Sequence, residues 1–323
     1  MNATGVITKR VDHIMIRVVE AKYKQLFSLL TETLQLPVAW PVNEDIPGFK
    51  TGGVFAGTIN MEIFQSGTQQ ALRSPVPSQA QLYGIAFEPY DLEAVVQEVD
   101  RRGIPHLPLM PVPEGIPLGT MGSMWTLLFF FQYPQSGSSE SFYARHIEPS
   151  AVYTIEPKSS TDFLARYKEV MKGAQDLVPF FNELFQQGMI FLCEYNKKYY
   201  DTTQGRLRRQ AELQARQGGP LGLLGVQEIV VGVKDMEAAR TSWQQLFDPL
   251  SEVELGRWEV GDGPAIRLVP RDQDGLVRMV WKVASLERAA AFLSGQGLLE
   301  HGSEGQIILD STKLYGLDIC LIE

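Results

Sequence analysis

The feature that most constrains the fold is a unit of one strand, one helix and further strands that recurs four times along the 323-residue chain. The units begin near Val11, Leu82, Gly225 and Leu276. Repetition at this scale means that each copy forms the same supersecondary structure and buries its apolar face against its neighbours. The sequence therefore predicts four similar modules.

Within each unit, the helix is predicted from apolar residues at three- and four-residue spacing and from capping residues at its ends. The predicted helices cover residues 20–36, 92–102, 236–247 and 286–293. Short strand-like segments follow each helix, as at 59–65 after the glycine-containing turn at 56–58. The predicted fold class is α+β, built from βαβββ units.

The composition of the chain limits the kinds of molecule that it is expected to bind. A 44% hydrophobic and 21% charged chain is typical of a globular protein. The formal net charge of -9 argues against a nucleic-acid binder, which normally has a basic domain. We therefore expect a small-molecule substrate and no nucleic acid.

The two cysteines and the apolar runs indicate the cellular compartment in which we expect the protein. Cys193 and Cys320 lie in apolar, strand-like segments, as is typical of buried thiols in a reducing compartment. The longest apolar run, 124–131, is far too short to span a bilayer. We expect a cytoplasmic protein without a membrane partner.

The first strand, Val11 to Val18, carries polar residues on one face. Strand side chains alternate, so His13, Met15 and Arg17 share one face and the apolar residues Ile14, Ile16 and Val18 share the other. Such a face is typical of a strand that lines a cavity. The alternative is a half-buried strand in which His13 is only hydrogen-bonded.

Paired units of this order resemble the vicinal oxygen chelate superfamily, which includes glyoxalase I, extradiol dioxygenases, methylmalonyl-CoA epimerase and the bleomycin- and fosfomycin-resistance proteins. The resemblance rests mainly on the first unit, with Asp12-His13-Ile14 opening a strand and the segment from Gly52 to Ile63 closing the unit. It implies two half-barrels, each formed by two units. It also implies that each unit can supply one metal ligand from its first strand and one from its last.

Carried over to this chain, the resemblance implies that His13 and Glu62 are metal ligands in unit one. A polar pair that binds nothing is the alternative. In unit two, Gly84 stands where a histidine would be, and Glu194 is taken as the counterpart of Glu62. Residues 135–188 then form an insertion between the last two strands of that unit.

Units three and four break the ligand pattern. Their first-strand positions are Glu228 and Arg278, and their last-strand positions are Arg267 and Asp318. Each unit would hold one ion pair where a metal would lie. The C-terminal half is therefore predicted to be vestigial and structural, and ordinary surface charges are the alternative.

These units define the expected domains. The N-terminal pair lies within 1–200, a linker helix within 201–222 and the C-terminal pair within 223–323. The insertion has a helix-like run, 161–187, with an aromatic face that must be covered. It would serve as a lid over the first barrel or as a subunit contact in a homodimer.

The expected function is a metal-dependent lyase or isomerase whose substrate chelates the ion through neighbouring oxygens. The ion would be Fe, Mn, Zn or Ni, because imidazole with two carboxylates is a fairly hard ligand set. Glu62 or Glu194 would act as the catalytic base. Arg17 would bind a substrate carboxylate or phosphate, unless it pairs with Glu88.

Glu88 and Trp125 complete the predicted substrate-binding set. Two other functions are left open. One is a metal-free small-molecule binding or resistance protein. The other is a ring-cleaving dioxygenase, which ranks lower because the dioxygenase pattern of the family uses two histidines and one glutamate.

Overall fold

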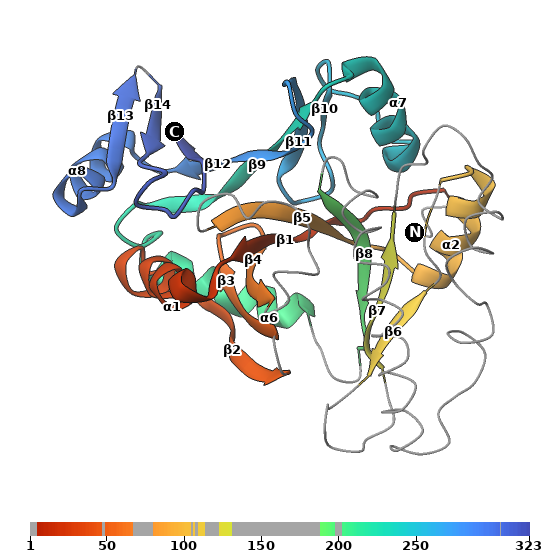
Figure 1. The fold of residues 1–323 in the computed structure, drawn as a ribbon, viewed down its shortest axis with the longest axis horizontal. Coiled ribbons are helices and arrows are strands. Elements are labelled where there is room, and N and C mark those ends of the chain that lie inside the picture. The colour runs from red at the N-terminus through yellow and green to blue at the C-terminus, as the bar shows by residue number, and fades with distance from the viewer. Residues whose placement is uncertain are drawn as a thin grey trace.

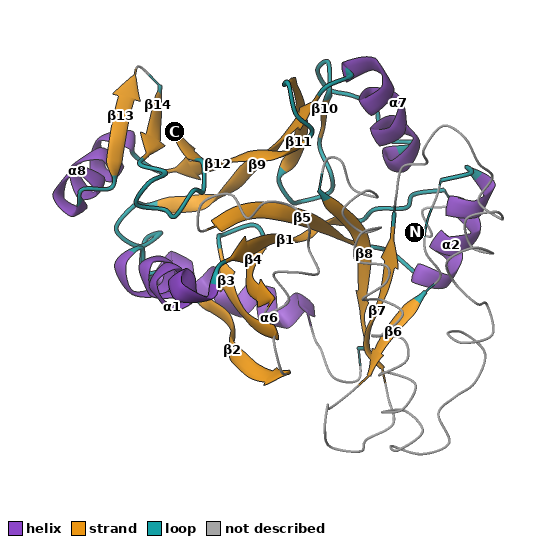
Figure 2. Ribbon diagram, in the orientation of Figure 1, coloured by secondary structure: helices purple, strands orange, loops and turns teal. Residues whose placement is uncertain are grey.

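The computed structural model describes residues 5–46, 49–66, 80–104, 106, 109–113, 123–130, 188–197, 202–303 and 305–323 (Figures 1 and 2). The predicted helix at 161–187 and nearly all of the insertion at 135–188 lie outside the described residues. No described helix is long and apolar enough to cross a membrane.

The N-terminal half forms one mixed sheet in the order β2-β3-β4-β1-β5-β8-β7-β6. Its strands are β1 (Arg10–Val18), β2 (Val38–Ile46), β3 (Phe49–Phe55), β4 (Asn60–Ser66), β5 (Ala80–Glu88), β6 (Met110–Pro113), β7 (Ser123–Phe129) and β8 (Met189–Tyr195). β1 and β5, the first strands of the two units, pair antiparallel at the centre. Each pairs in parallel with the last strand of its own unit, β4 or β8. The assignment of 189–195 as the last strand of unit two is confirmed.

The helices of this half follow the predicted pattern with one difference. α1 (Glu20–Ser28) continues as a π-helical turn, η1 (Leu29–Thr33), within the single predicted helix. α2 (Leu92–Arg101) begins at the predicted cap, where the Asp91 side chain accepts a hydrogen bond from the Ala94 N–H at 3.1 Å. That bond satisfies one of the amides that a helix N-terminus leaves unpaired.

The C-terminal half forms a second sheet in the order β10-β11-β9-β12-β15-β14-β13. Its elements are β9 (Leu223–Val233), α7 (Met236–Phe247), β10 (Arg257–Trp258), β11 (Ala265–Pro270), β12 (Gly275–Val283), α8 (Leu286–Gln296), β13 (Leu299–Ser303), β14 (Gln306–Leu309) and β15 (Ile319–Ile322). The third unit has only β10 and β11 after its helix, one strand fewer than a full βαβββ unit. The α+β class and the pairing of the units into two half-barrels are confirmed.

One hydrophobic cluster runs through both halves. It joins the apolar face of β1, such as Ile14 and Ile16, to residues of β9 and β12, such as Ile229 and Trp281. At the junction, the Val226 N–H donates to the Ala56 carbonyl, and the Thr58 hydroxyl donates to the Val226 carbonyl at 2.8 Å. A further helix, α6 (Thr202–Ala215), precedes β9 in the region predicted as a linker helix. The two sheets therefore share one core. The face of each sheet that points away from this core is available for a binding site.

Candidate functional site

The polar face of β1 lies at the centre of the first sheet. In the parallel pair with β4, His13 is opposite Asn60 and Met15 is opposite Glu62. Directly paired residues point to the same side of a sheet, so these four side chains share one face. The prediction that His13 and Glu62 come together from neighbouring strands is confirmed.

A β-bulge adds a third polar group. The register between β1 and β5 shifts between Val11, opposite Phe87, and His13, opposite Ala86, which leaves Asp12 as the extra residue. A bulge breaks the alternation of side chains, because two residues of one strand oppose one residue of the other. The Asp12 side chain consequently reaches the ring of His13 instead of pointing to the opposite face.

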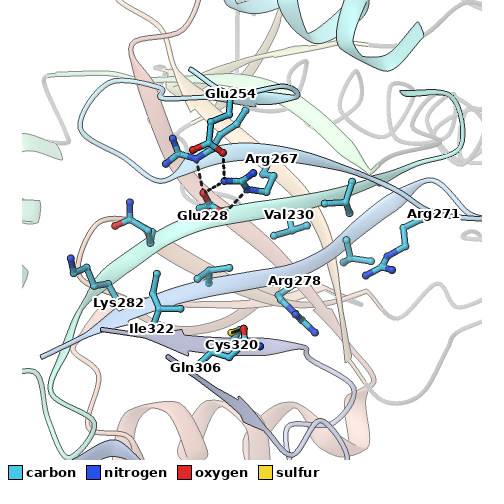
Figure 3. Close-up of a pocket in the computed structure, with 15 residues that line it drawn as sticks. Glu228, Val230, Glu254, Arg267, Arg271, Arg278, Lys282, Gln306, Cys320 and Ile322 are labelled. Atoms are coloured by element: carbon cyan, nitrogen blue, oxygen red, sulfur yellow. Dashed lines mark hydrogen bonds and ion pairs between the residues drawn. The ribbon is translucent and has the colours of Figure 1, made fainter. Parts of the chain in front are cut away.

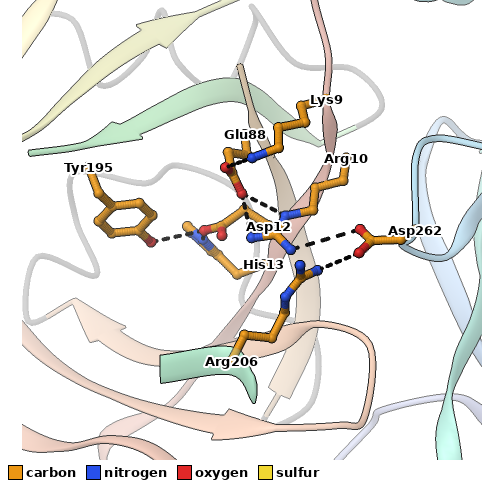
Figure 4. Close-up of polar contacts among 8 residues, drawn as sticks. All are labelled: Lys9, Arg10, Asp12, His13, Glu88, Tyr195, Arg206 and Asp262. Carbon is orange, nitrogen blue, oxygen red and sulfur yellow. Dashed lines mark hydrogen bonds and ion pairs between the residues drawn. The ribbon is translucent and has the colours of Figure 1, made fainter. Parts of the chain in front are cut away.

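Asp12, His13 and Glu62 form a chain of polar contacts (Figure 4 shows Asp12 and His13). His13 Nδ1 lies 2.8 Å from Asp12 Oδ2, and His13 Nε2 lies 3.3 Å from Glu62 Oε2 without an aligned hydrogen bond. The Thr51 hydroxyl donates to Glu62 Oε1 at 2.7 Å, which leaves Oε2 facing the imidazole. A carboxylate on one ring nitrogen sets the tautomer and leaves the other nitrogen for chemistry.

The charges on Asp12 and Glu62 favour the protonated form of the His13 imidazole. Burial alone would lower the pKa of His13, but the Asp12 and Glu62 carboxylates outweigh it and raise the pKa to about 9. Burial likewise acts to raise the pKa of Asp12, but the hydrogen bonds from His13 and Tyr195 lower it overall. At neutral pH, His13 is therefore an imidazolium, and its Nδ1–H donates to an ionised Asp12.

An apolar wall surrounds this polar group. Its buried members are Met15, Phe64, Ala86, Phe129, Phe191 and Cys193. The Phe191 ring stands edge-on to His13 at 5.7 Å between centroids, and the Tyr195 hydroxyl donates to Asp12 Oδ2 at 2.9 Å. Burial and the nearby Asp12 raise the pKa of Tyr195 well above its usual value, so the hydroxyl stays a donor. His13 itself is only 4% exposed.

Glu194 does not join this group. In the parallel pair with β5, Phe191 is opposite Ala86, so residues 191, 193 and 195 share the His13 face and Glu194 lies on the other face. There its Oε1 accepts the Leu92 N–H at 3.0 Å, at the first turn of α2. The expectation that Glu194 is the third ligand is not met by this geometry. The reason is that side chains alternate along β8, and the register of this strand puts Phe191, not Glu194, on the face of His13.

The described residues therefore do not fit a three-ligand metal site. The imidazole and carboxylate of His13 and Glu62 suit a divalent ion, but the unit-two positions are Gly84 and Phe191, which have no donor atoms. No group of three histidine, cysteine, aspartate or glutamate side chains within the described ranges is arranged to hold a metal ion. The assembled group is a carboxylate–imidazole–carboxylate chain.

Two of the predicted substrate-binding residues, Arg17 and Trp125, lie on the same face of the first sheet as His13. Arg17 lies on the His13 face, 6% exposed, with its guanidinium 5.9 Å from the centroid of the Tyr83 ring. Its Nη1 has no hydrogen-bond partner in the described part of the chain. Burial lowers the pKa of Arg17. Trp125 lies on the same face of the sheet, opposite Tyr195.

Glu88 is occupied elsewhere. It accepts from Lys9 Nζ at 2.5 Å and from Arg10 Nε at 2.6 Å (Figure 4). The suggested pair of Arg17 with Glu88 is therefore wrong. Because β1 and β5 run antiparallel, Glu88 lies opposite Arg10, and Arg17 lies opposite Gln81 at the other end of the strands.

Both ion pairs predicted in the C-terminal half are present. Arg267 donates from Nε and Nη2 to the two carboxylate oxygens of Glu228, at 2.9 and 3.1 Å. Arg278 makes the same two-pronged contact with Asp318, at 2.8 and 3.0 Å. Glu228 has a second partner, Arg257, whose Nε donates to it at 2.6 Å.

Asp12 and Tyr195 are the site residues that sequence reasoning missed. Alternation assigns Asp12 to the face opposite His13, and nothing in the order of residues marks the bulge. The signal that was present is the Asp-His pair itself, since a carboxylate beside a histidine is a common orienting partner. Tyr195 carried no such signal, because its contact depends on the packing of β8.

Comparisons with known proteins bear on the fold. No protein-family model matches the chain, and no curated protein is similar to it at a significant level. Among solved structures, it is similar to the 2,3-dioxygenase LapB from Pseudomonas sp. KL28, with a TM-score of 0.53, 10% identity and coverage of 98% of this chain and 92% of that chain. A variant of homoprotocatechuate 2,3-dioxygenase from Brevibacterium fuscum gives a TM-score of 0.52, 10% identity and coverage of 100% and 73%.

A hypothetical protein from Staphylococcus aureus is also similar, with a TM-score of 0.50, 11% identity and coverage of 96% of this chain and 98% of that chain. The agreement extends over nearly the whole chain in each comparison, so it includes both half-barrels and their order. The chain therefore has the same fold as these two dioxygenases, with paired βαβββ units in two half-barrels.

Proposed function

We propose that this protein is an enzyme of the lyase or isomerase type, which forms an enolate from a small oxygenated substrate on the concave face of the first sheet. The observation that carries the proposal is the buried His13 Nε2, 3.3 Å from Glu62 Oε2 and without a hydrogen bond. An imidazole nitrogen and a carboxylate oxygen thus lie next to each other without a hydrogen bond between them. Such a pair can exchange protons with a substrate placed between them.

The residues divide the work as follows. The His13 imidazolium donates its Nε2 proton to the substrate carbonyl oxygen, while Glu62 accepts the proton from the neighbouring carbon. Asp12 holds the ring by Nδ1 and stabilises its charge, and Tyr195 holds Asp12. The apolar wall excludes water, which strengthens these electrostatic interactions.

Arg17 suggests that the substrate is an anion. A buried guanidinium without a counter-ion is costly, and a carboxylate or phosphate would supply the missing partner. His13 and Arg17 are four residues apart, which is about 13 Å along a strand. A small oxo compound whose carboxylate or phosphate lies several bonds from its carbonyl would place the anionic group at Arg17 and the carbonyl near His13.

Hydrogen exchange tests the proposal directly. We expect the protein to catalyse incorporation of deuterium from D₂O at the carbon next to the carbonyl of some members of a panel of small oxo acids and oxo phosphates, which differ in the distance between carbonyl and anionic group; NMR follows the exchange. His13→Gln should reduce the rate at least about 100-fold, the lower end of general acid–base catalysis. His301→Gln, at an exposed histidine of the other half, is the matched control and should have no effect.

Two outcomes would count against this reaction. Equal exchange by wild type and folded His13→Gln would exclude His13 as the acid. Tight binding of a member of this panel with no exchange, lost in Arg17→Met, would instead support the metal-free binding or resistance protein.

A metal-dependent lyase or isomerase is the second candidate. It is favoured by the position of His13 Nδ1, which is held by Asp12 as the second nitrogen of a metal-bound histidine commonly is held by a carboxylate. His13 and Glu62 would then be the ligands, and a bound Fe, Mn, Zn or Ni ion would act as a Lewis acid on the substrate oxygens.

Elemental analysis separates the two candidates. After identical loading, wild type should contain one divalent ion per chain if the second candidate holds. His13→Ala and Glu62→Gln should then lose the ion, and Glu194→Gln should keep it. Equal, near-zero metal in all four proteins would rule the second candidate out.

A further inference from the structure

The concave face of the second sheet forms its own cavity, of about 620 Å³. β9, β11, β12 and β15 supply most of its lining (Figure 3). The volume is in the range of small-molecule sites, about 300 to 1,000 Å³. This cavity lies on a different sheet from His13 and Glu62, so it is independent of the function proposed above.

Positive charge dominates this cavity although the chain as a whole is acidic. The lining contains five cationic side chains, Arg257, Arg267, Arg271, Arg278 and Lys282, against two carboxylates, Glu228 and Glu254. Asp318 pairs with Arg278 and Glu259 pairs with Arg257, and with both counted the five cations exceed the carboxylates by one. An excess of fixed cations in a concave site concentrates anions.

Two of the arginines are held in place by the ion pairs of the vestigial ligand positions. Arg267 and Arg278 each use Nε and Nη2 for a carboxylate, and the Nη1 group of each has no partner in the described part of the chain. A guanidinium that is already oriented loses little further side-chain entropy when it binds an oxyanion. The ion pairs therefore prepare donors as well as stabilising the sheet.

Two further cations of the cavity lie apart from these ion pairs. Within the described ranges, no hydrogen bond or ion pair involves the side chains of Arg271 and Lys282, and both are exposed. Figure 3 shows them at opposite ends of the cavity, with Arg278 between them. Both side chains are therefore available to a ligand in the cavity.

The floor between the cations is apolar. Val230 and Val280 lie on the central strands, and Ile322 lies on β15. A ligand that matches both features has an apolar body and a negatively charged group. We propose that this cavity binds a small organic anion, a carboxylate or a phosphate monoester.

The test uses the full chain and two simple probes, benzoate and phenyl phosphate, with neutral benzyl alcohol as the matched control ligand. Binding is followed by titration calorimetry and by the Ile322 δ1-methyl signal in an isoleucine-labelled sample, which reports on this cavity only. We expect one or both anions, and not the alcohol, to shift the Ile322 signal. The anion that binds more tightly identifies the natural head group.

Variants make the assignment specific. Arg271→Gln combined with Lys282→Gln should weaken binding at least about tenfold, and both residues are exposed, so folding should be retained. Lys24→Gln, at an exposed lysine of α1 outside the cavity, should leave binding unchanged. The proposal is overturned if neither anion shifts the Ile322 signal, if the alcohol shifts it equally, or if the double variant binds as well as wild type.

Discussion

At the scale of single residues, one inserted position decides the chemistry of the first half. Alternation along β1 correctly assigns His13, Met15 and Arg17 to one face, and the bulge adds Asp12 to it. Without the bulge, His13 Nδ1 would lose its carboxylate partner. The imidazole would then be held only by Glu62 and would lose its main orienting contact.

The charge on His13 makes the stability of the protein depend on pH. The pKa of His13 is about 9 in the folded protein and 6.5 when unperturbed, so the folded state binds the proton more tightly. The resulting stabilisation is fully present below pH 6.5 and is lost as the pH rises through 9. It is on the order of 3 kcal/mol, since one pKa unit corresponds to about 1.4 kcal/mol. Urea unfolding at pH 6.5 and pH 9.5 measures this loss.

The buried thiol of Cys193 acts in the same direction at the alkaline end. Burial raises its pKa well above the usual value, so the unfolded state gains stability as that thiol ionises. His13→Gln separates the two effects, because the variant keeps the cysteine and removes the imidazole. If the free energy of unfolding falls between pH 6.5 and pH 9.5 by the same amount in His13→Gln as in wild type, the assigned role of His13 is wrong.

At the scale of elements, the structure gives Glu194 a role in α2. Its carboxylate accepts the Leu92 N–H, one of the amides that a helix N-terminus leaves without a partner. Glu194→Ala should lower the free energy of unfolding by about 0.5 to 2 kcal/mol, as for other lost caps. Glu93→Ala, which removes an exposed acid from the same helical turn, should cost less. An equal effect of the two changes, measured by urea unfolding, would argue against the cap.

The two ion pairs of the second sheet should differ in strength. Arg278 and Asp318 are 34% and 36% exposed, so Arg278→Ala should cost about 1 kcal/mol or less. Glu228 is 14% exposed and accepts from two arginines. Glu228→Ala should therefore cost about 1.5 to 3 kcal/mol, the range for hydrogen bonds to charged groups. Thermal or urea unfolding of the two variants, with equal losses, would contradict this ranking.

At the scale of the whole molecule, the two halves meet too closely to be independent. Gly57 has a φ of +83°, and a Cβ there would lie 2.6 Å from Gly225 Cα in the other half. Gly57→Ala should therefore combine backbone strain with overpacking, each costing about 1 to 3 kcal/mol. Because the core is shared, the loss should appear in one cooperative unfolding transition of both halves.

Gly103→Ala is the control for this prediction. Gly103 also has a positive φ, of +63°, but a Cβ there would meet no described atom within 4 Å. It should therefore show the strain without the overpacking. If calorimetry shows two separate transitions, or if the two alanine variants lose the same stability, the close junction does not couple the halves.

The amino-acid sequence by itself determined the elements and their order. Apolar periodicity is a local property, so it predicted α2, α7 and β8, and the repetition of one unit predicted four similar modules. The pairing of these modules into half-barrels was what the resemblance to a known superfamily implied. The ion pairs of Arg267 and Arg278 followed as well, because the last strand of each unit lies beside its first.

Only the tertiary structure decided which polar groups meet. The register of β8 against β5 places Phe191 beside His13 and turns Glu194 to the other face of the sheet. Both residues lie in the same apolar run, so the sequence alone did not distinguish them. The antiparallel register of β1 and β5 gave Glu88 to Arg10, and the bulge brought Asp12 to His13. Register and bulges are set by the packing of whole strands against one another, so no single stretch of sequence specifies them.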